Sequence, residues 1–185
     1  MHISSYIFSH MLYQMLLCAL QTGVTMYITK LTGVKYPVEG LITPWLIVDI
    51  GISLLLITYA SDMLSLWVST LAHTTTTAMT IMPFLLIVQL LLSGFVFSLD
   101  GVMKALSNAT ISKWGLNAIC IAADVNHLSV PSDNYIMAAL KNDYYDQYNP
   151  KQFHLLRIWL ILLLITVIFV LLTRLFISTV EKDKR

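Results

Sequence analysis

Two aspartates in the second apolar stretch of the chain, Asp49 and Asp62, have the clearest potential for chemistry. A carboxylate at membrane depth costs a few kcal/mol or more, and it often marks a proton or cation pathway. The two residues are 13 positions apart, which is about 20 Å along a helix. Catalytic carboxyl pairs lie about 5–10 Å apart, so this spacing excludes a catalytic dyad. The pair is either a proton or cation site, or one aspartate lies at each interface of a tilted helix.

Polar side chains follow one face of the first apolar stretch. On a helix that turns about 100° per residue, they fall within about 60° of one another. They are His10, Gln14, Gln21 and Thr25. Such a stripe is typical of helix–helix contact in a larger bundle, and the alternative is the wall of a substrate path. His10 has no second ligand at zinc-like spacing, so we expect no metal site.

The third apolar stretch and the segment after it contain helix-breaking and interfacial residues. Pro83 can kink a helix and free a carbonyl group, and Ser93-Gly94 permits close approach of two backbones. The segment 102–125 contains Trp114 and is too polar to span a membrane comfortably. We expect this segment to lie at the interface, or to dip into the membrane and return.

Enzyme motifs are absent from the sequence. It contains no G-x-x-x-x-G-K-[ST] loop that could cradle a phosphate, and no nucleophile elbow, H-E-x-x-H or G-x-G-x-x-G motif. The two cysteines, Cys18 and Cys120, are too few for a disulfide scaffold and lack zinc-ligand spacing. We therefore expect the chain not to be an enzyme and to bind no cofactor itself.

The hydrophobic composition of the chain indicates that these residues lie in a membrane protein. Hydrophobic residues make up 57% of the 185 residues and charged residues only 11%, against about 25% charged in an average soluble domain. So little charge excludes a soluble domain and a disordered chain. The net charge of +1 argues against nucleic acid as a partner. The sequence thus predicts an all-α integral membrane protein.

Charge-free runs place the spans. A spanning helix needs about 20 apolar residues, and we expect four transmembrane helices, with a re-entrant or interfacial helical segment before the last. Their predicted limits are 3–28, 44–70, 78–99 and 154–177, and residues 100–153 form an external helical loop. Arg174, Lys182, Lys184 and Arg185 cluster near the C-terminus. Positive charge marks the cytoplasmic side, so both termini are expected to be cytoplasmic.

The stretch from Tyr59 to Asn126 resembles the membrane domain of G-type ATP-binding-cassette exporters. It is most similar to the bacterial form in which a forkhead-associated domain and an ATPase precede the permease. The resemblance rests on AMTIMP at 78–83, Gln89, SGFVFSL at 93–99, SKWGLNA at 112–118 and Asp-Val-Asn at 124–126.

The resemblance implies a function and roles for several residues. The family's membrane domain has six spans, of which these four would be the third to sixth. It implies an ABC ATPase domain or subunit that holds ATP and Mg²⁺, and a second permease domain in a dimer in the bacterial plasma membrane. The substrate path or dimer contact would then involve His10, Gln14, Gln21, Gln89, Ser93 and Gly94. The turn from His73 through Thr74, Thr75, Thr76 and Thr77 would couple to the ATPase, the alternative being a solvated turn without that role. Trp114 would serve either as an external gate or as an anchor at the membrane interface.

The sequence also departs from this family. The first two spans and the whole ATPase are missing, and Asp62 stands where a small or apolar residue is expected. The chain would then be the C-terminal piece of a longer protein, a truncated gene product, or one subunit among several. The leading hypothesis is the permease part of an exporter of an amphipathic or lipid-like substrate. The alternatives are a small proton- or ion-coupled membrane protein, a non-transporting accessory subunit, or a remnant.

Overall fold

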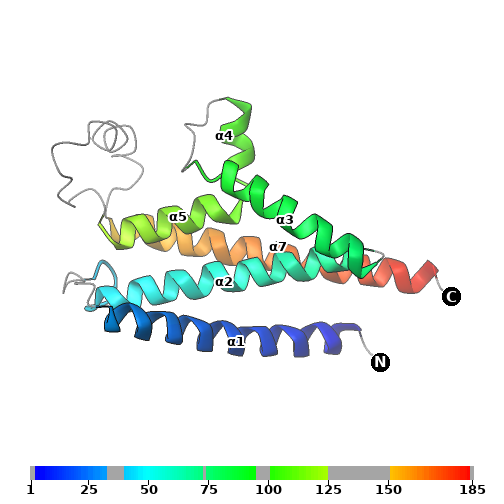
Figure 1. The fold of residues 1–185 in the computed structure, drawn as a ribbon, viewed down its shortest axis with the longest axis horizontal. Coiled ribbons are helices and arrows are strands. Elements are labelled where there is room, and N and C mark those ends of the chain that lie inside the picture. Colours follow the sequence, from blue (N-terminus) through cyan, green and yellow to red (C-terminus); the bar gives the residue numbers. More distant parts are fainter. Residues whose placement is uncertain (1–2, 33–39, 73, 95–100, 125–150, 184–185) are drawn as a thin grey trace.

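The computed structural model describes residues 3–32, 40–72, 74–94, 101–124 and 151–183. Within these ranges all regular structure is helical. The helices are α1 (Ile3–Leu31), α2 (Leu46–Leu71), α3 (Thr75–Leu91), α4 (Val102–Ser107), α5 (Ile111–Ala122) and α7 (Gln152–Asp183). Figure 1 shows α1, α2 and α7 as long helices that run along the molecule, and both ends of the chain lie toward the same end of the bundle.

Three of these helices are long and apolar enough to cross a membrane, namely α1 over Ile7–Leu31, α2 over Leu46–Leu71, and α7 over Gln152–Ser178. The prediction of an all-α membrane protein is confirmed. The span expected at 78–99 differs, because its helix α3 has 17 residues and ends at Leu91. Residues 92–94 form a turn, and the end of the expected span at 95–99 lies outside the described residues.

The centre of the bundle is α2, which packs against α1, α5 and α7. Small residues allow close packing, since Ala60 on α2 and Ala118 on α5 are fully buried. Aromatic rings join α2 to α7 as well, with the ring centroids of Trp67 and Phe169 5.7 Å apart. Burial of apolar side chains between these helices forms the core that holds α5 in place.

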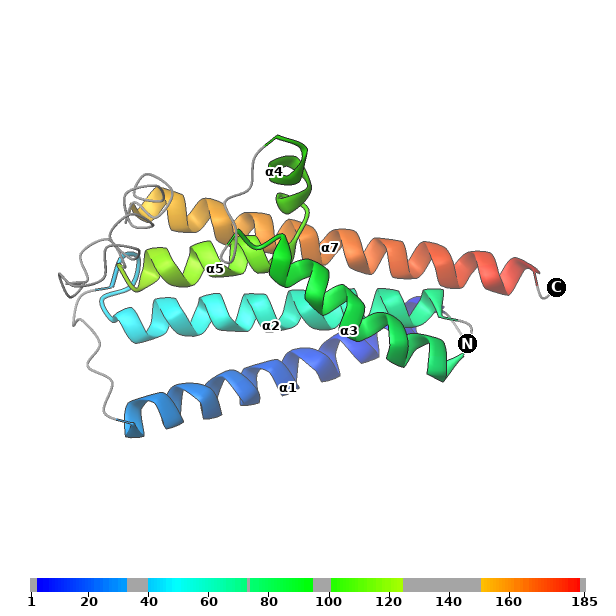
Figure 2. The ribbon, with the colours of Figure 1, turned by 45° about the horizontal axis from the view of Figure 1, so that its top comes forward.

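Two short helices take the place of one long helix beside α2. Figures 1 and 2 both show α3 and α5 following one another along the length that α2 covers alone, with α4 standing away from the bundle between them. Gly115 of α5 faces α2, and a Cβ atom there would lie 3.0 Å from Cγ1 of Ile57. The absence of a side chain at Gly115 therefore lets α5 lie directly on α2.

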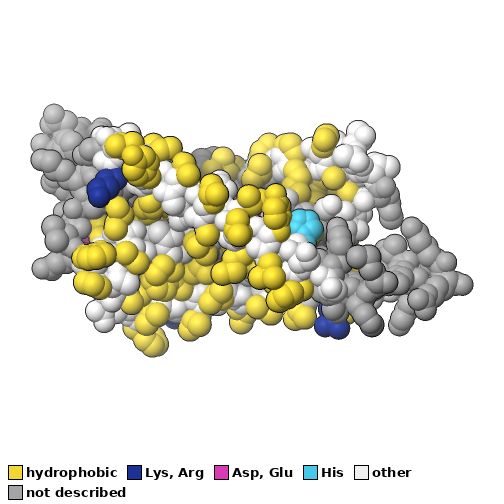
Figure 3. Space-filling model, turned by 90° about the horizontal axis from the view of Figure 1, so that it is seen from below, with side chains coloured by type: hydrophobic (Ala, Val, Ile, Leu, Met, Phe, Trp, Pro, Cys, Tyr) yellow, Lys and Arg dark blue, Asp and Glu magenta, His cyan; other side chains and the backbone are white. Residues whose placement is uncertain are grey.

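The outer surface of the long helices is apolar. Large hydrophobic side chains on α1 are exposed, including Phe8 at 62% and Leu16 at 65%. Figure 3 shows many hydrophobic side chains on this face, which α1 crosses, with backbone and other side chains between them. A surface of this kind suits contact with lipid or with another apolar protein surface.

Candidate functional site

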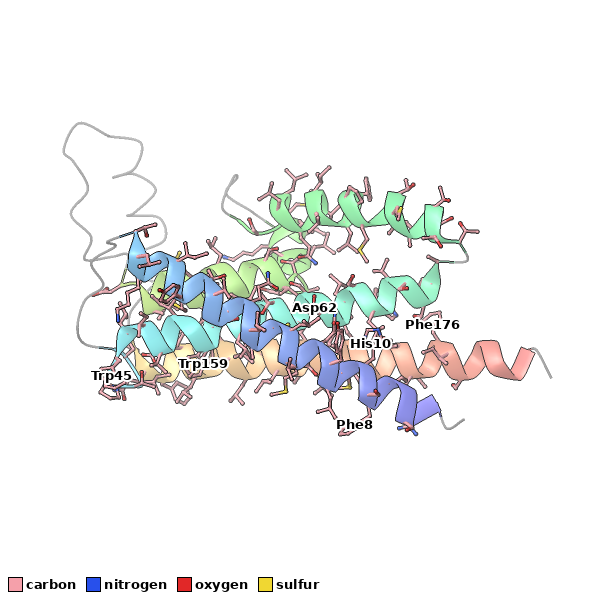
Figure 4. All side chains as sticks on the ribbon, turned by 60° about the horizontal axis from the view of Figure 1, so that its bottom comes forward. Phe8, His10, Trp45, Asp62, Trp159 and Phe176 are labelled. Carbon is pink, nitrogen blue, oxygen red and sulfur yellow. The ribbon has the colours of Figure 1, made fainter. Side chains whose placement is uncertain are left out.

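The contact between α1 and α2 contains a thiol, a carboxylate and a hydroxyl group. Cys18 is 1% exposed, and its Sγ donates a hydrogen bond to Oδ2 of Asp62 over 3.0 Å. Figure 4 shows Asp62 in the middle part of the bundle, far from the end marked by Trp45. Thr22, one turn beyond Cys18, is buried, and its Oγ1 has no hydrogen-bond partner in the described structure. Asp62 therefore faces a polar contact between two helices.

Sequence reasoning missed Cys18 and Thr22. Both were neutral residues in an apolar stretch, and only their spacing of four could have placed them on one helix face. The predicted stripe lies beside this face instead of forming it. His10 and Gln14 are half-buried, whereas Gln21 and Thr25 are exposed. The structure thus brings the first half of the stripe near other helices and leaves the second half on the surface.

Asp49 holds the chain segment that leads into α2. Its carboxylate is fully buried, and it accepts hydrogen bonds from the backbone N–H groups of Leu41, Ile42 and Thr43 at 2.8, 3.0 and 3.1 Å. The hydroxyl of Thr43 donates a fourth hydrogen bond at 2.9 Å. Four donors satisfy the acceptor oxygens of a carboxyl group well. Asp49 and Asp62 therefore have separate surroundings on one helix, and Asp49 stabilises a folded-back segment.

Gln89 and Ser93 lie near the end of α3, where the chain turns away. Oε1 of Gln89 accepts a hydrogen bond from the hydroxyl of Ser112 on α5 at 3.1 Å. The hydroxyl of Ser93 donates to the carbonyl oxygen of Leu90 at 2.7 Å. Gly94 follows with a φ of 79°, which glycine adopts far more readily than other residues. Gly94 therefore permits a turn here, whereas the sequence suggested close approach of two helices.

Trp114 lies in a polar network at the turn between α4 and α5. Its Nε1 donates to the carbonyl oxygen of Asn108 at 2.8 Å, which fixes the indole ring. Lys113 Nζ donates to Oδ1 of Asn108 at 2.7 Å and to the hydroxyl of Ser107 at 3.0 Å. Burial lowers the pKa of Lys113 from its usual value of 10.5, and the nearby charge of Lys104 lowers it further. From the sequence, Trp114 was predicted to be an external gate, whereas Lys104 and Lys113 indicated only that the segment 102–125 lies at the membrane interface or dips into the membrane.

The predicted coupling turn is polar and exposed. Thr74 precedes α3, and its hydroxyl oxygen accepts from the backbone N–H of Thr77 at 3.2 Å, as an N-cap does. The two hydroxyl groups also share a hydrogen bond of 2.7 Å. The side chains from Thr74 to Thr77 are all exposed, and His73 lies outside the described residues. In Figure 1 this turn lies toward the end of the bundle where the chain starts and finishes.

The described residues contain no group of three or more His, Cys, Asp or Glu side chains that could hold a metal ion. The polar groups of Asp49, Asp62, Gln89 and Trp114 lie in separate places along the bundle, and they do not form one catalytic site. Their arrangement suits contact between helices.

Comparison with known proteins gives one match. The family model described as ABC-2 type transporter matches residues 1–122, from α1 to the end of α5. No curated protein and no solved structure matches the chain.

Proposed function

Because the chain belongs to the ABC-2 type transporter family, we propose that it is the permease part of an ATP-driven exporter of an amphipathic or lipid-like molecule. The family assignment makes the chain a membrane-embedded permease component, and permeases of this family generally partner with an ABC ATPase subunit. Outward transport, a bacterial plasma membrane and cytoplasmic termini belong to the proposal. ATP and Mg²⁺ would bind to the partner ATPase.

The observation that carries the proposal is exposed polarity on a helix that could cross the membrane. Gln21 and Thr25 are exposed on α1 among large apolar side chains. A side-chain amide in lipid would lose its hydrogen bonds with water, which costs a few kcal/mol. This face of α1 therefore needs either a second permease domain or a water-filled path beside it.

The remaining polar residues fit roles in the same assembly. His10 and Gln14 lie on the same stripe of α1 as Gln21. At the end of α3 and in the turn after it lie Gln89, Ser93 and Gly94. Both groups are candidates for the substrate path or the dimer contact. The turn from His73 to Thr77 would contact the ATPase, because its threonines are exposed at the end proposed to be cytoplasmic. Trp114, at the start of α5, would form the external gate.

Asp62 supports a second candidate function, a proton- or ion-coupled membrane protein. This carboxylate lies within a membrane-spanning helix and is hydrogen-bonded to a single described side chain, Cys18. Carboxylates within membrane-spanning helices often mark proton and cation pathways. An ATP-driven exporter would need Asp62 only for the contact between α1 and α2.

The test is ATP-driven transport by the native complex. The chain, tagged at its C-terminus, is extracted from its source membranes in mild detergent with its associated ATPase and reconstituted in vesicles. We expect vanadate-sensitive movement of a short-chain fluorescent lipid, and a loss of that movement in Gln21→Leu. Ser9→Leu serves as the matched control, because Ser9 is also exposed on α1 but lies about 120° from Gln21.

Two results would overturn the proposal. The first is a purified complex without an ATPase. The second is transport that persists without ATP, stops when the proton gradient is collapsed, and fails in Asp62→Asn. The second result would establish the alternative function.

A further inference from the structure

Two positive charges lie at the turn between α4 and α5. Lys104 is exposed on α4, and Lys113 is half-buried in the first turns of α5. Among the residues that the structure describes, neither lysine forms an ion pair with a carboxylate. The polar partners of Lys113 are the neutral oxygen atoms of Ser107 and Asn108. Within the part of the chain that the structure describes, the two lysines thus form a site of positive charge that no carboxylate balances.

Lys113 is held in position by its neighbours. Two hydrogen bonds fix its Nζ, and Nζ also lies 5.8 Å from the centroid of the Trp114 ring, within the range of a cation–π contact. Trp114 is in turn tied to the carbonyl of Asn108. Fixing a lysine side chain costs conformational entropy, and these contacts have already met that cost before any ligand arrives. Such preorganisation favours binding.

Burial and the neighbouring lysine both lower the pKa of Lys113. The folded chain therefore disfavours the positive charge at this position. An anion placed between Lys104 and Lys113 would reverse this effect, because it would interact favourably with both ammonium groups. Phosphate is a suitable anion, since lysine binds it as a point charge.

The surroundings of the two lysines are apolar. The α4 helix exposes Val102 at 76%, Met103 at 54% and Leu106 at 53% of their surface. Figures 1 and 2 show α4 standing away from the bundle, in agreement with the exposure of these side chains. A ligand that combines a negative headgroup with an apolar tail would match both halves of this surface.

We propose that Lys104 and Lys113 bind the phosphate headgroup of an amphipathic molecule, with Trp114 beside the headgroup and the apolar side chains of α4 beside the tail. If the bound molecule is the transported substrate, this inference names the substrate class of the proposed exporter and rests on that proposed function. The same headgroup chemistry also occurs in an anionic membrane lipid that stays bound. The experiment has one arm for each source.

The first arm measures binding without ATP. The purified complex is titrated with phosphatidylglycerol in mixed micelles, with phosphatidylcholine as the neutral comparison, and bound lipid is counted by native mass spectrometry. We expect tighter binding of phosphatidylglycerol, and a loss of about fivefold in affinity for Lys104→Gln and for Lys113→Gln, since each lysine near an anionic headgroup contributes about 1 kcal/mol. Lys30→Gln is the matched control, because Lys30 is exposed at the far end of α1.

Folding of the variants is checked by gel filtration and by Lys113→Arg, which keeps the charge and should keep the binding. Equal binding of both lipids by the wild type would overturn the proposal. Unchanged phosphatidylglycerol binding by the double variant Lys104→Gln/Lys113→Gln would overturn it as well. Because this arm requires no ATP, its binding result can be interpreted even if the chain is not part of an exporter.

The second arm measures ATP-driven movement of fluorescent phosphatidylglycerol in vesicles. If the site holds the substrate, Lys113→Gln will slow the movement of this lipid and Lys30→Gln will not. If the site holds a resident lipid, Lys113→Gln will lose bound phosphatidylglycerol in the first arm. In the second arm, even the wild type will then show no ATP-driven movement of this lipid. Both patterns support the headgroup site and assign its source.

Discussion

The Sγ atom of Cys18 lies 3.0 Å from Oδ2 of Asp62 and joins α1 to α2 across 44 positions of the chain. This hydrogen bond lies within the part of both helices that could cross a membrane. The thiol is a weak donor, and it donates to an oxygen of the half-buried carboxyl group of Asp62. The pair gives Asp62 a structural role that does not require proton transport.

Removing this donor should weaken the contact between α1 and α2. We expect Cys18→Ala to lower stability by about 1–3 kcal/mol, because the carboxylate of Asp62 loses its described side-chain donor. Cys18→Ser keeps a donor and should lose less. The measurement is the melting temperature in detergent, and Cys120→Ala is the control, since Cys120 is a free, half-buried cysteine elsewhere in the fold. Equal melting temperatures for Cys18→Ala and Cys120→Ala would contradict this account.

Neighbouring threonines at the start of α3 allow a second comparison. Thr74→Ala removes the N-cap side chain, which should destabilise the first turn of α3 by about 1 kcal/mol. Thr75→Ala changes an exposed residue one position later, which makes none of the side-chain hydrogen bonds described for Thr74. Amide hydrogen exchange at residues 76–79 should quicken in Thr74→Ala only. If the turn also couples to the ATPase, Thr74→Ala will in addition uncouple ATP hydrolysis from transport.

The segment before α2 depends on Gly40 as well as Asp49. A Cβ atom at Gly40 would collide with the carbonyl oxygen of Thr43 and lie 2.9 Å from the backbone nitrogen of Leu46. We expect Gly40→Ala to displace this segment from Asp49 and to lower the melting temperature clearly. Gly23→Ala is the matched control, because a Cβ atom there meets nothing within 4 Å and alanine favours a helix by up to about 1 kcal/mol. A similar melting temperature for the two variants would show that the segment can adapt.

The fold class, an all-α membrane protein, could be predicted from the sequence because the composition is too hydrophobic for a soluble domain. Hydropathy and charge-free runs depend on local composition, and the long helices α1, α2 and α7 carry that signal throughout. The end of α3 was harder to predict from the sequence. The turn at Gly94 requires a positive φ, and an apolar sequence continues on both sides of it, so hydropathy extended the predicted span beyond Leu91.

The candidate site was harder to predict because its contacts are distant in sequence. Asp49 was interpreted as a residue at the interface or in a proton path, and its four donors come from a segment that folds back onto α2. Cys18 gains its importance only from its distance to Asp62. Neither the contact of Asp49 with this segment nor that of Cys18 with Asp62 can be detected from composition or periodicity.

The contact of α5 with α2 can be tested at two glycines that both lie in helices. Gly115→Ala places a Cβ atom 3.0 Å from Cγ1 of Ile57, whereas Gly51→Ala places one 3.7 Å from the flexible end of Met26. Both changes gain the same helix propensity. The melting temperature should therefore be lower for Gly115→Ala, by the equivalent of about 1–3 kcal/mol of overpacking.

Removing the side chain of Ile57 tests the cause of this difference. Ile57→Ala alone leaves a cavity and is destabilising, but it also removes the atoms that a Cβ atom at Gly115 would meet. The double variant Gly115→Ala/Ile57→Ala should thus be more stable than the sum of the single changes, by a coupling energy of about 0.5–3 kcal/mol. Strictly additive effects would mean that α5 does not lie against α2 at Gly115, and the position of Lys113 and Trp114 on α5 would then need revision.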